Sequence, residues 1–61
     1  MERELTLHLG RKANITATDN NEWCGVIREV NKGVLLLRVP NYDDSCIYIN
    51  IQHIIAVYYP N

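Results

Sequence analysis

Four polar residues at two expected turns are the side chains of this sequence best suited to bind a ligand. Gln52 and His53 form an adjacent hydrogen-bonding pair inside the otherwise apolar segment 46–59. Asn31 and Lys32 begin a second turn and supply an amide and a positive charge. Amide, imidazole and ammonium groups can contact nucleobases and phosphates, so these four residues are candidates for binding single-stranded RNA. Each pair also has a purely structural explanation, because polar turn residues satisfy backbone groups in hairpins.

Other reactive side chains lack partners at a useful spacing. Asp43 and Asp44 are adjacent, and neighbouring side chains of an extended chain diverge instead of converging on one atom. Cys24 and Cys46 lie outside CxxC or CxxH spacing, which predicts free, largely buried thiols, with one disulfide as the alternative. His8 has no evident nucleophile or metal-ligand partner. We therefore expect no enzyme activity, no cofactor and no metal.

The charge balance gives no positive sign of a polyanionic partner, so a nucleic-acid site has to rest on the local arrangement of residues. Six lysines and arginines face seven aspartates and glutamates, which leaves a formal net charge of −1. The loop at 40–45 contains two adjacent aspartates and would repel phosphate. No apolar window approaches the roughly 18 residues of a membrane span, and the first residues lack a signal-peptide pattern. We therefore expect a cytoplasmic protein without a membrane partner.

Strands must position the candidate residues, because isoleucine, valine and threonine are abundant and alanine is scarce. The expected strands lie at 13–18, 22–31, 34–39, 47–51 and 54–59. Turns are expected at 19–21, at 31–33 and around the Gln52-His53 pair. Residues 4–9 alternate like a strand but could equally form one helical turn, and the pattern leaves this open. Without a linker or an internal repeat, residues 1–61 are expected to form a single domain.

Two features of these strands predict a small, strongly bent β-barrel. Gly25 lies inside the long second strand, where a missing side chain permits a sharp bend or the close approach of another backbone. Four consecutive apolar residues, 34–37, predict a third strand that is covered on both sides. Five short strands with tight turns and such a bend are typical of SH3-like and OB-like barrels.

The C-terminal segment 46–59 predicts self-association. Its polar residues are Asn50, Gln52 and His53, and the part from Ile54 onward is apolar on both faces. A final strand of this kind forms an exposed apolar edge, which favours pairing with another copy of the chain. A domain of this size also buries little surface alone and gains stability by assembly. The expected interface residues are Tyr48, Ile49, Ile51, Ile55, Val57 and Tyr59.

Two stretches of the chain resemble the motifs of the Sm-like proteins. The residues from Trp23 to Arg38 are similar to the first motif, in which a strand glycine and a polar turn precede an aliphatic strand. They also resemble the matching part of bacterial Hfq without a gap. The residues from Tyr48 to Pro60 resemble the second motif, with Gln52-His53 where Hfq carries Lys-His. The similarity covers residues 9–60.

This resemblance implies a five-stranded barrel and a homo-oligomeric ring in which strand four of one subunit pairs with strand five of the next. It further implies single-stranded RNA bound around the central pore by the turns after strands two and four, here Asn31, Lys32, Gln52 and His53. The alternative is a structural or protein-interaction ring without RNA binding. The acidic charge balance favours this alternative, and so does Gln52, which stands where Hfq carries a lysine. The apolar run at 54–59 disfavours a monomeric SH3-type domain.

Overall fold

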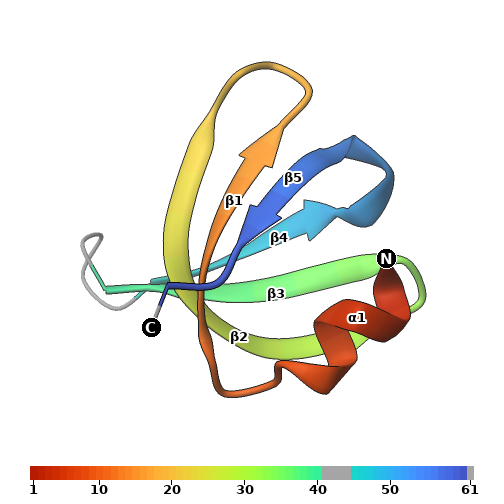
Figure 1. Cartoon of the computed structure of the whole chain (residues 1–61), viewed down its shortest axis with the longest axis vertical. Coiled ribbons are helices and arrows are strands. Elements are labelled where there is room, and N and C mark those ends of the chain that lie inside the picture. The colour runs from red at the N-terminus through yellow and green to blue at the C-terminus, as the bar shows by residue number, and fades with distance from the viewer. Residues whose placement is uncertain (41–44, 61) are drawn as a thin grey trace.

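The computed structural model describes residues 1–40 and 45–60, which form a mainly β structure (Figure 1). Within these residues a short helix, α1 (Glu2–Leu7), precedes five strands. The strands are β1 (Lys12–Ala17), β2 (Glu22–Asn31), β3 (Val34–Val39), β4 (Ser45–Asn50) and β5 (Ile54–Tyr58), and a 3-10 turn, η2 (Ile51–His53), joins β4 to β5. They form an antiparallel sheet in the order β4-β3-β2-β1-β5. The expected all-β class is confirmed. The sheet is not closed, because β4 and β5 are its two edges.

The N-terminal segment is helical, which resolves the alternative that the sequence pattern left open. Leu5 is completely buried, whereas Leu7 and Leu9 are 74% and 47% exposed. A strand would place all three leucines on one face, and only one of them is accommodated in the core. The helix lies beside the turn that joins β2 to β3, so the start of the chain is close to one of the candidate sites (Figure 1).

The residues of β1 alternate as expected, with Ile15 fully buried and its two strand neighbours half-buried on the opposite face. The following turn contains Asn20 in the left-handed region, with φ of 66°. The Asp19 carboxylate accepts hydrogen bonds from the N–H of Asn21, at 3.1 Å, and from its side-chain amide, at 2.7 Å. These contacts confirm the expected turn at 19–21 and explain its Asp-Asn-Asn sequence.

The second strand bends strongly, and Gly25 is the reason that another backbone can approach it closely. A Cβ atom at this position would overlap the backbone carbonyl of Arg38 on β3. A β-bulge between Ile27 and Glu29 adds to the curvature, which is visible along the whole length of β2 (Figure 1). The predicted close approach at Gly25 is therefore confirmed.

The core lies on the concave side of the bent sheet. Its members are Leu5, Ala13, Ile15, Ile27, Leu35, Leu37, Val39, Ile49 and Ile54. The third strand differs from the expectation of cover on both sides, because Val34 and Leu36 on its outer face are only half-buried. A single sheet with one short helix has no second layer to cover that face.

A second expectation, that the two cysteines are largely buried, is wrong. Cys24 and Cys46 are free, but both are exposed, not buried. Cys24 lies opposite Asn14 on β1, and Cys46 lies opposite Arg38 on β3. Their strand neighbours Gly25 and Ile47 take the inward positions, and successive side chains of a strand point to opposite faces. The thiols therefore lie on the outer surface of the sheet.

Residues 41–44 lie outside the described part of the chain, so the expectation that the loop at 40–45 repels phosphate is not tested there. Ser45, which the sequence assigned to this loop, is the first residue of β4.

Candidate nucleic-acid interface

A backbone hydrogen bond brings together the two turns that carry the candidate RNA-binding residues. The N–H of Ile51, at the start of η2, donates to the carbonyl of Gly33 in the β2–β3 turn over 2.9 Å. The adjacent strand residues Val34 and Asn50 are paired in the β3–β4 ladder. Antiparallel pairing of β3 and β4 therefore places both turns at one end of the sheet. Turns 20 residues apart in the sequence become neighbours in the fold.

The first of these turns is a two-residue hairpin. Asn31 and Val34 form its last ladder pair, and Lys32 and Gly33 between them have positive φ values of 51° and 76°. Two consecutive left-handed residues define the type I′ turn, whose twist matches that of the flanking strands. The structural role assigned to this segment is confirmed, and the turn leaves both Asn31 and Lys32 exposed.

The second turn presents Gln52 and His53 at the corner between β4 and β5. The Asn50 side chain accepts a hydrogen bond from the Gln52 N–H at 3.1 Å, which caps the 3-10 turn. The His53 carbonyl accepts a hydrogen bond from the Thr18 N–H at 2.7 Å and thereby ties this corner to the β1–β2 turn. Both bonds use backbone groups of Gln52 and His53, and the side chains of these two residues are exposed.

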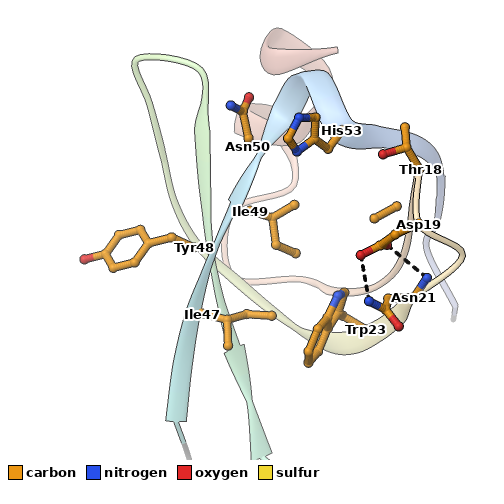
Figure 2. A pocket seen from close by; sticks show the side chains of 10 residues that line it. Thr18, Asp19, Asn21, Trp23, Ile47, Tyr48, Ile49, Asn50 and His53 are labelled. Atoms are coloured by element: carbon orange, nitrogen blue, oxygen red, sulfur yellow. Dashed lines mark hydrogen bonds between the residues drawn. The ribbon is translucent and has the colours of Figure 1, made fainter.

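His53 borders a cavity of about 400 Å³ that lies between β4 and the β1–β2 turn. Figure 2 shows Ile49 pointing into this cavity, Trp23 at its base, and Tyr48 pointing away from it. Asp19 and His53 contribute polar groups to its lining. The cavity therefore combines apolar walls with hydrogen-bonding groups, and its carboxylate makes it unfavourable for phosphate.

Asn31 and Lys32 border a different hollow, of about 430 Å³, on the outer face of the sheet. Leu36 and Tyr48 line it together with Glu29, and Tyr48 is 75% exposed. The structure therefore joins the two candidate turns through their backbones, while the side chains of Lys32 and His53 border separate hollows. The four residues do not form one continuous pocket within a single chain.

One residue at this interface was not indicated by sequence reasoning. The Glu2 carboxylate, at the start of α1, accepts a hydrogen bond from the Gly33 N–H at 2.6 Å. The two residues are 31 positions apart, and no local pattern connects a helix-initiating glutamate with a hairpin glycine. The contact depends on how α1 lies against the sheet.

The residues predicted for the interface between copies of the chain fall into three groups that differ in exposure. Tyr48 and Ile55 are exposed on the two edge strands, at 75% and 58%. Ile51, Val57 and Tyr59 are half-buried and pack against the core. Ile49 is 8% exposed and belongs to the core of its own chain, so its side chain has little surface left for a partner.

The C-terminal residues also contact α1 through an aromatic pair. The rings of His8 and Tyr59 are stacked, with centroids 3.8 Å apart. Burial raises the pKa of the Tyr59 hydroxyl above its usual value, and the Glu4 carboxylate raises it further. This pair ties the helix to the end of β5.

Comparison with known proteins identified no matching family model, no similar curated protein and no similar solved structure. Across residues 1–40 and 45–60, no cluster of three histidine, cysteine or acidic side chains could hold a metal ion. None of the helices in the described segments is long and apolar enough to cross a membrane.

Proposed function

We propose that the chain is an Sm-like, SH3-like open barrel that assembles into a homo-oligomeric ring and binds single-stranded RNA near the central pore. The observation that carries this proposal is the hydrogen bond from Ile51 to Gly33, which holds two exposed polar turns side by side. The strand order and the strong bend of β2 support the barrel.

Assembly is supported by the two edge strands, which expose unpaired backbone groups and apolar side chains. Tyr48 on β4 and Ile55 and Tyr58 on β5 are at least 58% exposed. Antiparallel pairing of β4 in one subunit with β5 in the next would satisfy the backbone groups and cover these side chains. Such a contact joins two different surfaces, and it closes into a ring when the rotation between subunits is a whole fraction of a turn.

RNA binding is supported by the exposure of Asn31, Lys32, Gln52 and His53 at the joined turns. Each subunit offers one cation there, so a single subunit would bind weakly and with a strong salt dependence. A ring repeats the turns around its axis, and several weak contacts to one strand multiply its apparent affinity.

A structural ring without RNA binding is the second candidate, and two carboxylates favour it. Glu2 contacts the turn of Lys32, and Asp19 lines the cavity that His53 borders. Both would oppose a phosphate group. The formal net charge of −1 acts in the same direction.

Fluorescence anisotropy with labelled oligo-U and oligo-A, at two salt concentrations, separates these two functions. We expect saturable binding at low salt that weakens as salt is added. His53→Ala should lower the affinity at least about threefold, because it removes a hydrogen-bonding group. Light scattering of the same samples should show an unchanged mass. Absence of any anisotropy change at low salt would favour the structural ring.

A further inference from the structure

We infer that the backbone N–H of Gly33 is an anion site for a phosphate group, which the chain's own Glu2 carboxylate occupies when no ligand is bound. That this phosphate comes from RNA rests on the proposed function. The anion site itself rests on the contact between Glu2 and Gly33.

The geometry of the hairpin leaves the Gly33 N–H outside the hydrogen-bonded ladder of β2 and β3. Asn31 and Val34 are the last residues paired between β2 and β3, and Gly33 lies beyond them in the turn. Its N–H is therefore available to an acceptor from outside the hairpin. Lys32 and Gly33 both have positive φ, and the Gly33 N–H donates to Glu2 on α1 and not across the hairpin.

The structure already contains an anion at this position. A Glu2 carboxylate oxygen lies 2.6 Å from the Gly33 nitrogen, the short distance typical of a charge-assisted hydrogen bond. A phosphate oxygen has the same charge and acceptor character, so it can replace the carboxylate oxygen without a change in the turn. Lys32, adjacent in sequence and exposed, adds the positive charge that a phosphate prefers.

Glu2 can leave this position at low cost. It is the first residue of α1 and is exposed, whereas Leu5 anchors the helix in the core. A change of side-chain rotamer therefore releases the carboxylate and leaves the helix in place. The Gly33 carbonyl stays bonded to Ile51, so the neighbouring η2 turn keeps its position during the exchange.

The consequence is a competition that weakens binding of any single phosphate. The Glu2 carboxylate is part of the same chain and therefore has a high effective concentration at the turn. A free anion of equal intrinsic affinity displaces it only at a concentration above that value. A ligand with several phosphates can displace several carboxylates of a ring at once. Glu2 would then favour long strands over mononucleotides or inorganic phosphate.

Glu2→Gln tests this inference, and Glu4→Gln is its matched control. Both variants remove one negative charge from the first turn of α1, and only Glu2 contacts Gly33. The probe is inorganic phosphate at constant ionic strength, and the readout is the NMR shift of the Gly33 amide. We expect half-saturation at a concentration about 3- to 10-fold lower in Glu2→Gln than in the unmodified chain or in Glu4→Gln.

The same three proteins are then titrated with labelled oligo-U. Tighter binding by Glu2→Gln alone supports displacement of Glu2 by an RNA phosphate. Equal tightening by both variants would mean that net charge acts at a distance, which overturns the site. A Gly33 amide that does not respond to phosphate in either Glu2→Gln or the unmodified chain also overturns it, even if RNA binds. A response to phosphate without RNA binding by any protein would retain the anion site and reject the proposed RNA function.

Discussion

At the residue scale, Gly25 has the least room for a side chain among the glycines of the described chain. Its place in the long second strand predicts a bend or a close backbone approach, and the structure puts the Arg38 carbonyl where a Cβ would be. Gly33 is constrained differently, because its N–H and its carbonyl contact two separate elements, α1 and η2. One glycine permits the curvature of the sheet, and the other joins the elements that meet at the candidate interface.

Gly25→Ala should destabilise the protein by roughly 1–3 kcal/mol, because the added methyl group must displace the backbone of β3. Urea denaturation at a fixed protein concentration measures this free energy of unfolding. Gly10→Ala is the comparison, because an added Cβ there meets nothing within 4 Å and only the positive φ opposes it. Equal denaturation midpoints for Gly25→Ala and the unmodified protein would contradict the close approach.

At the scale of elements, α1 illustrates how a six-residue helix is maintained by tertiary contacts. A helix of this length is unstable by itself in water. Leu5 anchors it in the core, Glu2 bonds to the β2–β3 turn, and His8 stacks on Tyr59. Glu2, Leu5 and His8 are three residues apart, so these contacts follow one side of the helix from its first residue to its C-cap. The helix therefore positions Glu2 at the candidate interface only while Leu5 remains buried.

Leu5→Ala should lower the free energy of unfolding by about 2–5 kcal/mol, the usual cost of truncating a fully buried leucine. Leu7→Ala, at a position that is 74% exposed, should change it by less than about 0.5 kcal/mol. Urea denaturation of both variants measures the difference. Similar values for the two substitutions would show that α1 does not contribute to the core.

At the scale of the whole molecule, the bent sheet packs around one small hydrophobic core, and its two edge strands are β4 and β5. Exposed apolar side chains on β4 and β5 make these edges suitable for pairing with other copies of the chain. Val57 packs against the core, so a charge at that position would disturb the fold as well as any assembly. Ile55 is exposed and provides the cleaner test.

Ile55→Asp should reduce the mass measured by light scattering from a multiple of 7.1 kDa to that of one chain, because the charge disfavours strand pairing at the β5 edge. Leu7→Asp is the control, since it places the same charge at an exposed site on α1. The control should keep the mass of the unmodified protein. An unmodified chain that stays at 7.1 kDa at micromolar concentration would contradict the assembly.

The local patterns of this chain determined its class and its strands. Alternation around Ile15, the Asp-Asn-Asn and Asn-Lys-Gly turns, and the polar pair at Gln52 depend on the period of a strand and on the backbone angles of turn residues. Both are properties of short segments, and the predicted strand positions agree with the structure to within about two residues. The same reasoning placed all four candidate residues at turns, and the structure has three of them in turns and Asn31 at the end of β2, all four exposed.

Tertiary structure decided what those patterns left open or predicted wrongly. The core accommodates Leu5 and leaves Leu7 exposed, which makes the first segment a helix, and the register of β2 and β4 turns Cys24 and Cys46 outward. Whether Glu2 meets Gly33, or the turns at 31–33 and 51–53 become neighbours, depends on how whole elements pack. Those contacts join residues about 20 to 30 positions apart, and a local pattern holds no information about separations of that length.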